Sequence, residues 1–230
     1  YLPDLYRAEV EIASALARLV STATPAPTLK VDKAIAWFEA REGFELAELQ
    51  RQAIRRGLTE RLLVITGGPG TVKTTLVRAI TEILRRKDQR LLIASPTGRA
   101  AKRLGEATDL PARTIHRLLE YDPRQHGFLR GPGRPLEGDV LIIDEVSMID
   151  CTLMSLLLRA LPADCRLILI GDADQLPSVG PGRVLDDLIA SRRIGVVPLT
   201  DIFRHSRASR IVQIAHRVNN GLLPQLDDSD

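Results

Sequence analysis

The sequence predicts an α/β domain in which a parallel sheet is flanked by helices. Five short runs are apolar at every position, and segments with helical periodicity separate them; the runs are "LLVIT", "LLIAS", "VLIID", "LILIG" and "GVVPL". Strands that are apolar on both faces are typical of a parallel sheet covered on both sides. In such sheets ligands bind at the carboxyl ends of the strands. The polar residues that follow these runs therefore predict where the site lies.

Helices are expected between the strands and in the first 60 residues. Three segments between strands have helical periodicity: "TTLVRAITEILRR", "CTLMSLLLRAL" and "RVLDDLIA". Near the start, apolar residues recur at helical spacing at Leu5, Val10, Ile12, Leu16 and Leu19. After the linker "STATPAPT", further helices are expected at 31–40 and in "FELAELQRQAIRRGL". Residues 1–60 are thus predicted to form a helical segment ahead of an α/β domain at 61–230.

The stretch "EYDPRQHGFLRGPGRPLE" fits neither a helical nor a strand period. Its length and its content of Gly, Pro and Arg predict an inserted hairpin at about 120–138 that turns at "GPG", with Arg130 and Arg134 near the tip. The alternatives are a mobile loop, and basic residues that only form a solvated face.

Composition excludes several classes of protein. No apolar run reaches the roughly 18 to 20 residues that a membrane helix needs, so secretion and membrane insertion are not expected. Cys151 and Cys165 lie in apolar surroundings and are predicted to be buried, reduced thiols, which fits the cytoplasm. A net charge of +3 and a pI near 9.1 permit a polyanionic partner. With 3% aromatic residues, contacts to phosphates are expected rather than base stacking.

The segment "GGPGTVKTT" at 67–75 is close to a phosphate-binding loop. That loop reads G-x-x-x-x-G-K-[ST] between a buried strand and a helix, and here Gly67 opens it while Lys73 and Thr74 close it. The amides from Gly70 onward would meet phosphate oxygens at the positive end of the helix. Lys73 would bridge the β- and γ-phosphates, and Thr74 would hold Mg²⁺. The alternative is a glycine-rich turn with an incidental lysine.

Val72 departs from the pattern, because the second glycine is expected there. Glycine is needed where the backbone approaches phosphate or takes a positive φ, and a β-branched residue is penalised there by about 1 to 2 kcal/mol or more. If the loop relaxes around the valine, nucleotide binding weakens; if the loop cannot relax, binding fails. The sequence leaves both outcomes open.

Acidic side chains follow the next two strands. Asp144 is the last residue of "VLIID" and Glu145 follows it directly. Asp172, Asp174 and Gln175 follow "LILIG". Adjacent carboxylates at the end of a buried strand are unfavourable unless a cation or water lies beside them. Asp144 is suited to bind Mg²⁺, Glu145 to activate water, and the amide of Gln175 to contact a γ-phosphate. We expect the two acids on a strand next to the phosphate-loop strand. A solvated turn or a helix cap is the alternative for each.

Six ordered motifs give a more specific signal. The segments "GGPGTVKTT", "ASPTGRAAKRL", "TIHRLL", "IIDEVSM", "GDADQLPSVGPG" and "LTDIFRH" resemble those of superfamily 1 DNA helicases of the RecD-like group. The segment "LAELQRQAI" resembles the Q motif of that family. The resemblance implies a RecA-like P-loop NTPase fold and a motor that uses ATP and Mg²⁺ to move 5′ to 3′ along single-stranded DNA.

The resemblance also implies roles for individual residues. Those implied to act in catalysis are Lys73, Glu145, Gln175 and Arg204. Those implied to bind nucleotide are Gln50, Gly68, Pro69, Gly70, Thr71, Val72, Lys73, Thr74 and Thr75, and the metal would lie at Thr74 and Asp144. Those implied to contact the DNA backbone are Thr97, Gly98, Arg99, Thr114 and His116, and Lys102 and Arg103 cluster near them. The family usually has glutamine after the arginine of "IFRH", where this chain has His205.

The implied partners are single-stranded DNA, duplex junctions, subunits of a recombination complex and a second RecA-like domain of a longer protein. The inserted hairpin falls where related helicases carry the small domain that splits the duplex. The main alternative is a non-hydrolysing DNA-binding or regulatory module derived from such a motor. A GTPase or small-molecule kinase is disfavoured, since no N-K-x-D segment is present.

Overall fold

The computed structural model describes residues 2–22, 29–68 and 73–199, together with 214, 218 and 221–223. Most of the predicted linker "STATPAPT" lies outside these residues, and so do two further sets of predictions. One is the middle of the phosphate loop, with Pro69, Gly70, Thr71 and Val72. The other is the "IFRH" segment, with Arg204 and His205.

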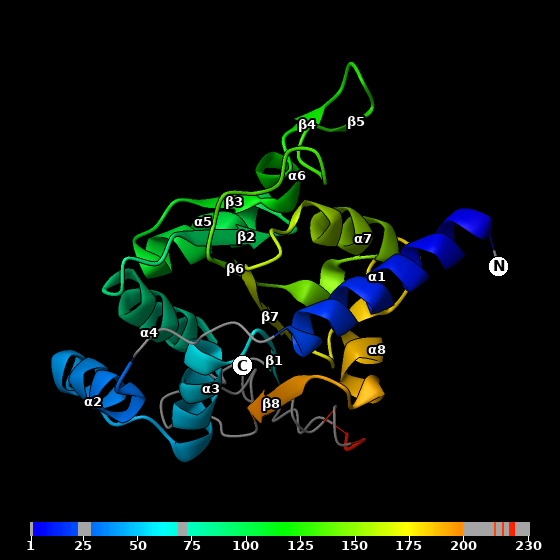
Figure 1. The fold of residues 1–230 in the computed structure, drawn as a ribbon. Coiled ribbons are helices and arrows are strands. Elements are labelled where there is room, and N and C mark those ends of the chain that lie inside the picture. Colours follow the sequence, from blue (N-terminus) through cyan, green and yellow to red (C-terminus); the bar gives the residue numbers. More distant parts are fainter. Residues whose placement is uncertain are drawn as a thin grey trace.

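A six-stranded parallel sheet forms the centre of the molecule (Figure 1). Its order is β3-β2-β6-β7-β1-β8, with every neighbouring pair parallel. The strands are β1 (Leu62–Gly67), β2 (Leu91–Ser95), β3 (Ala112–Thr114), β6 (Val140–Ile143), β7 (Arg166–Gly171) and β8 (Gly195–Leu199). The α/β class and all five predicted strands are confirmed. The edge strand β3 was not predicted, because its three residues, Ala-Arg-Thr, carry no apolar run.

Two layers of helices cover the sheet. On one face lie α2 (Val31–Glu42), α3 (Glu48–Thr59), α4 (Lys73–Arg85) and α5 (Gly98–Thr108), packed on alternate strand residues such as Ile65 and Ile142. On the other face lie α1 (Pro3–Ser21), α6 (Ile115–Leu118), α7 (Cys151–Ala160) and α8 (Val184–Ser191), packed on Val64 and Ile143. Alternation along each strand divides the apolar side chains between these two cores.

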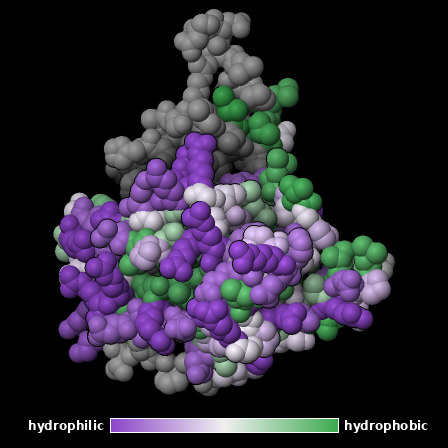
Figure 2. Space-filling view, turned by 90° about the horizontal axis from the view of Figure 1, so that it is seen from above, coloured by the Kyte–Doolittle hydropathy of each residue, from purple (hydrophilic) through white to green (hydrophobic). Residues whose placement is uncertain are grey.

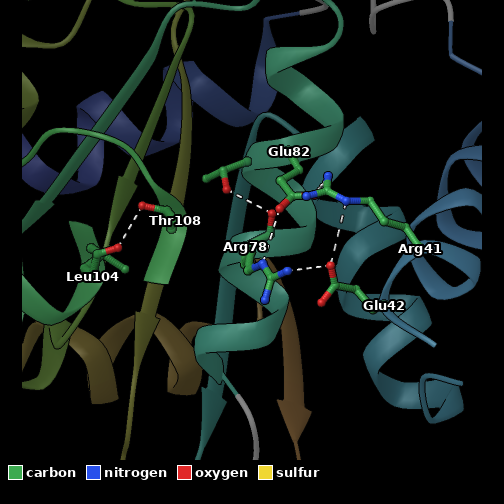
Figure 3. Close-up of polar contacts among 7 residues, drawn as sticks. Arg41, Glu42, Arg78, Glu82, Leu104 and Thr108 are labelled. Carbon is green, nitrogen blue, oxygen red and sulfur yellow. Dashed lines mark hydrogen bonds and ion pairs between the residues drawn. The ribbon is translucent and has the colours of Figure 1, made fainter. Parts of the chain in front are cut away.

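The helices of the first 60 residues contribute to both cores. Helix α1 buries Ala8, Ile12, Leu16 and Leu19, whereas Val10 is 46% exposed and lies outside the packed stripe. Helices α2 and α4 are joined by ion pairs of Arg41 with Glu82 at 2.6 Å and of Arg78 with Glu42 (Figure 3). Arg78 also contacts Glu82 at 3.2 Å within α4. The helix that begins at Lys73 is therefore braced by the segment that precedes the sheet.

The insertion projects from the top of the molecule as a short hairpin (Figure 1). Strands β4 (Tyr121–Asp122) and β5 (Gly127–Phe128) pair antiparallel, so the chain turns at 123–126 and not at "GPG". Asp122 fixes that turn, because its side chain accepts a hydrogen bond from the Arg124 amide at 2.9 Å. The "GPG" segment makes a second tight turn, in which Gly131 and Arg134 exchange backbone hydrogen bonds.

The two arginines predicted near the hairpin tip instead brace its base. Arg130 pairs with Glu120 at 2.8 Å and with Glu137 at 3.1 Å, and Arg134 pairs with Glu120 at 2.9 Å. Hydrogen bonding to Arg130 holds the pKa of Glu120 below its usual range. The prediction placed these arginines near the tip because the sequence does not show that they pair with acidic residues at the base.

The two cysteines are buried, as their apolar surroundings predicted. Cys151 and Cys165 are both free and buried, and burial raises the pKa of Cys165 to about 12. The face drawn in Figure 2 is largely hydrophilic, with apolar side chains in smaller areas between the polar ones. Across the ranges described above, no helix has both the length and the apolar character needed to cross a bilayer.

Candidate active site

The predicted site residues follow three strands at the carboxyl edge of the sheet. Strand β1 leads to the phosphate loop and Lys73, strand β6 leads to Asp144 and Glu145, and strand β7 leads to Gln175. In the sheet, β7 lies between β1 and β6, so the two acids are one strand further from the phosphate loop than expected. The expectation of a neighbouring strand was wrong, because chain order does not fix the order of strands in a parallel sheet.

A cleft of about 460 Å³ opens at this edge. Three segments that the motifs assign to nucleotide chemistry contribute Thr74, Asp144, Glu145 and Gln175 to its lining. Helix α5 supplies the rest of one wall, and the remaining lining residues are Thr97, Arg99, Ala100, Arg103, Leu104 and Met148. The fold thus brings residues predicted for the metal, the water, the γ-phosphate and the DNA backbone around one space.

Lys73 opens helix α4 and points back at the strand that precedes the loop. Its ammonium donates hydrogen bonds to the carbonyl oxygens of Gly67 and of Gly68, the latter at 3.2 Å. Thr74 is exposed in the cleft, and Thr75 is half-buried behind it. Because the first amides of a helix carry partial positive charge, this helix start adds to the field of the lysine.

Asp144 has a carboxyl group that is largely removed from water. Its pKa is raised to about 6, mainly by burial; the charge of Glu145 also raises the pKa, whereas the hydrogen bond from the Glu145 amide and the charge of Lys73 lower it. One oxygen of Asp144 accepts a hydrogen bond from the Glu145 amide at 2.9 Å. Lys73 is therefore near enough for its charge to act on this carboxyl, although the lysine itself does not line the cleft.

Glu145 has a backbone conformation that is rare for a residue with a side chain. Its φ is 60° and its ψ is 42°, in the left-handed region, where a non-glycine residue costs about 1 kcal/mol or more. The 3₁₀ turn η1 (Val146–Met148) follows directly and packs against the end of β7. Gly171 permits that approach, because a Cβ at this position would lie 3.3 Å from the Ser147 nitrogen and 3.4 Å from the Val146 nitrogen.

The donor set in the cleft fits magnesium. Among the residues with described positions, no group of three or more His, Cys, Asp or Glu side chains could hold a metal ion by itself. Magnesium is usually held by one or two protein oxygens, several waters and substrate phosphates. A buried carboxylate at Asp144 and the hydroxyl of Thr74 on the same cleft supply that kind of partial shell.

Asp172 braces the segment that carries Gln175. This carboxylate is 2% exposed, and it accepts hydrogen bonds from the Asp174 amide at 3.1 Å and from the Gln175 side-chain nitrogen at 3.2 Å. The Ala173 amide is held by Thr66 at 3.3 Å. Asp172, one of the acids that the sequence singled out, therefore orients a glutamine at the cleft instead of facing the cleft itself.

The residues predicted to contact DNA begin two helices. Thr97 caps α5 by accepting a hydrogen bond from the Ala100 amide at 3.2 Å, and Thr114 caps α6 in the same way at the Arg117 amide. A Cβ added at Gly98 would meet nothing within 4 Å, so the backbone there is open to a ligand. His116 is exposed, with its ring 5.6 Å from that of Phe128. Neither Thr114 nor His116 lines the cleft.

Gln50 lies outside the cleft, whereas Arg103 lines it. Gln50 is 3% exposed, caps α3 by accepting a hydrogen bond from the Ala47 amide at 2.9 Å, and does not line the cleft. Arg103, grouped with the DNA contacts, lines the cleft together with Arg99. The signal for Arg103 was its position four residues after Arg99, which places both on one face of a helix.

Known proteins with similar sequences extend over this whole region. Residues 50–181, more than half of the chain, match the family described as the AAA domain. The chain is 39% identical over 228 residues to the ATP-dependent RecD2 DNA helicase of Deinococcus radiodurans, covering 99% of this chain and 31% of that protein. It is 35% identical over 212 residues to the RecBCD enzyme subunit RecD of Mycobacterium tuberculosis, covering 82% of this chain and 35% of that protein.

A solved structure shows the same fold. The Pif1 helicase from Candida albicans superposes with a TM-score of 0.60 and 24% identity, over 79% of this chain and 46% of that one. The chain spans about a third of the length of the curated relatives named above. The family match and the ordered motifs cover the same part of the chain. The chain therefore belongs to the AAA domain family, and within it to the RecD-like helicases of superfamily 1.

Proposed function

We propose that this chain is the ATP-hydrolysing motor domain of a DNA helicase that moves 5′ to 3′ along single-stranded DNA and unwinds duplexes. The observation that carries the proposal is the cleft in which Thr74, Asp144, Glu145 and Gln175 meet from three separate segments. A site without phosphate chemistry has no need of a buried acid, a strained neighbouring acid and a braced glutamine around one space.

Each residue has a task in the hydrolysis of ATP. Lys73 exchanges the carbonyls of Gly67 and Gly68 for β- and γ-phosphate oxygens when the nucleotide binds. Asp144 and Thr74 would hold Mg²⁺, which supplies charge neutralisation to the phosphates. Glu145 accepts the proton of the water whose oxygen attacks the γ-phosphorus, while ADP leaves. Gln175, held by Asp172, donates its amide to the γ-phosphate.

Arg204 and the loop amides at 69–72 belong to the same proposal through the family motifs alone. So does Gln50 as an adenine contact. A second RecA-like domain of the intact protein would close the cleft, because the relatives named above are about three times as long as this chain. Subunits of a recombination complex are proposed partners on the same basis. The buried, reduced thiols fit a protein of the cytoplasm.

The DNA would run past the start of α5. Thr97 and Gly98 offer an open helix start, and no ion-pair partner for Arg99 exists among the described side chains. Phosphate contacts of this kind are independent of sequence and sensitive to salt. Because Arg99 lines the nucleotide cleft as well, strand binding and nucleotide state can influence one another through α5.

The second candidate is a module that binds DNA without hydrolysing ATP. It is favoured by a single observation, the valine at position 72, where the phosphate loop calls for glycine.

ATPase activity of the intact protein, with and without single-stranded DNA, separates the two candidates. We expect stimulated turnover that falls at least about 100-fold in Glu145→Gln, with nucleotide affinity retained, because only the proton acceptor is lost. Val72→Gly should increase nucleotide affinity. Asp164→Asn, at an exposed turn on the opposite edge of the sheet, is the matched control and should equal the wild type. Absence of hydrolysis in both the wild type and Val72→Gly would leave the non-hydrolysing module.

A further inference from the structure

Two buried hydroxyls beside the cleft have no hydrogen-bond partner. Within the described ranges, the buried side-chain atoms that lack one are Nε and Nη1 of Arg61 and the Oγ atoms of Ser95 and Ser147. Arg61 lies ahead of β1, at the far edge of the sheet, and its third nitrogen is bonded to the Ala163 carbonyl. Both serines lie at the carboxyl edge. Buried polar groups in folded proteins are normally paired, so two such hydroxyls at one edge need an explanation.

Ser95 stands beside Asp144. It is the last residue of β2 and is fully buried. Ala94 of β2 pairs with Ile143 of β6, and the Asp144 amide donates a hydrogen bond to the Ala94 carbonyl at 3.0 Å. The residues that follow this pair, Ser95 and Asp144, are therefore neighbours across the two strands. Neighbouring strands are about 4.8 Å apart. Side chains two positions apart on a strand point to the same face of the sheet. Ile93 and Ile142, two positions before Ser95 and Asp144, both pack in the same core, so the Ser95 and Asp144 side chains lie on one face of the sheet.

Ser147 stands between the two acidic segments. It lies in η1, two residues after Glu145, and its backbone nitrogen approaches Gly171 at the end of β7. One residue beyond Gly171 is Asp172, the carboxylate that holds Gln175. The Ser147 hydroxyl is thus enclosed where the segment that carries Glu145 meets the segment that carries Gln175.

We propose that Ser95 and Ser147 are positioning residues whose hydroxyls acquire partners when a magnesium nucleotide binds. Ser95 then hydrogen-bonds the Asp144 carboxylate or a water of its metal shell, and Ser147 hydrogen-bonds the segment that presents Gln175. The inference rests on the proposed function of the cleft. An unpaired buried hydroxyl destabilises the free protein, and a bond that forms only on binding adds to affinity. Replacing either serine with alanine is therefore predicted to maintain or raise the stability of the free protein and to weaken nucleotide binding.

The test compares Ser95→Ala and Ser147→Ala with Ser155→Ala in the intact protein. Ser155 is 5% exposed, and its hydroxyl donates to Glu11 at 2.6 Å, so it is a buried serine with its partner already present. For each variant we would measure the melting temperature without nucleotide. The other measurements are the affinity for a fluorescent, non-hydrolysable ATP analogue and the Mg²⁺ concentration that gives half-maximal ATPase activity.

We expect Ser95→Ala and Ser147→Ala to melt at or above the wild-type temperature while they lose roughly tenfold in analogue affinity or in Mg²⁺ response. Ser155→Ala should melt lower and bind normally. The inference is overturned if the cleft variants melt lower, which would mean that their hydroxyls are paired in the free protein. It is also overturned if affinity and Mg²⁺ response stay within about twofold of wild type.

The outcome for the serines is distinct from the outcome for the proposed function. A wild-type protein that binds the analogue but does not hydrolyse ATP contradicts the proposed motor, and the melting and affinity measurements still decide the role of the serines. A wild-type protein that hydrolyses ATP, with serine variants equal to it, contradicts only the inference drawn from the unpaired hydroxyls.

Discussion

Asp144 carries a carboxyl group that the fold has moved out of water. Its neighbours on β6 are fully buried, and burial is the main reason that its pKa rises to about 6. An acid whose pKa is higher in the folded than in the unfolded protein opposes folding once both states have lost the proton. The buried carboxylate therefore destabilises the free domain at neutral pH, and the cation that we propose at Asp144 would offset this cost.

Asp144→Asn is expected to stabilise the metal-free protein at neutral pH. From pH 4 to 6 the unfolded state loses its proton before the folded state, so wild-type stability falls relative to the variant. Above pH 6 the difference should reach about 2 to 3 kcal/mol, and below about pH 3 it should vanish because Asp144 is then neutral in both the folded and the unfolded protein. Urea unfolding at pH 4.5 and 7.5, followed by Trp37 fluorescence, measures this. Equal differences at the two pH values would contradict the burial effect, and added Mg²⁺ should stabilise only the wild type.

At the scale of elements, close contacts hold the site. The turn η1 reaches β7 only because Gly171 lacks a side chain, and Asp172 fixes Gln175 immediately beyond. Helix α4, which begins with Lys73, is tied to α2 by the ion pairs of Arg41 and Arg78. Arg78 is 37% exposed, so each pair contributes at most about 1 kcal/mol, and the network matters more for the orientation of α4 than for stability.

Gly171→Ala and Gly98→Ala are expected to separate packing from ligand contact. A Cβ at Gly171 would lie 2.8 Å from a methyl group of Leu185 and close to the backbone of η1, so that variant should lose about 1 to 3 kcal/mol of stability and most of its ATPase activity. A Cβ at Gly98 meets nothing within 4 Å, so that variant should keep its stability and its basal ATPase activity.

The second variant should nevertheless bind single-stranded DNA more weakly, because the added methyl group occupies the open helix start of α5. Thermal unfolding, ATPase assays and fluorescence anisotropy with a labelled oligonucleotide measure the three quantities. A destabilised Gly98→Ala, or a Gly171→Ala variant with unchanged activity, would contradict this division.

The elements also show which parts of the fold the sequence could predict. The five apolar strands were predictable because burial on both faces produces an uninterrupted apolar run. Strand β3 was not, because at the sheet edge three residues of mixed polarity pair with β2 through backbone alone. The turn of the hairpin was misplaced, since "GPG" and the Asp122 turn are both acceptable turn sequences and strand pairing chose between them.

At the scale of the whole molecule, the two edges of the sheet differ in the contacts that their arginines make. The amino edge holds buried Arg166, which donates to the Leu58 carbonyl at 2.7 Å, and the ion pair of Arg90 with Asp139 at 2.9 Å. These contacts join strands and helices. The carboxyl edge leaves Arg99 and Arg103 facing open space in the cleft, without ion-pair partners among the residues that could be described. The cleft at the carboxyl edge therefore presents to a ligand two arginines without ion-pair partners in the described ranges.

Salt dependence of single-strand binding should locate the DNA at that side. Arg99→Ala is expected to weaken binding and to reduce the slope of log K against log salt concentration by about 0.7, the value for one lost phosphate contact. Arg159→Ala, which removes an exposed arginine on α7, is the matched control and should leave both quantities unchanged. A titration from 50 to 300 mM salt by fluorescence anisotropy measures the slope, and equal slopes for the two variants would place the strand elsewhere.

The sequence by itself determined the α/β class and the positions of five strands, and it singled out the candidate residues of the segment 67–75, because these depend on local periodicity and on motifs within one segment. Only the tertiary structure decided that β7 separates the loop from its acids, that Asp172 serves Gln175, that Arg103 lines the cleft and that Arg130 and Arg134 brace the hairpin. Each of these depends on which distant segments pack together, and hydrogen-bond and ion-pair partners are chosen by that packing and not by spacing along the chain.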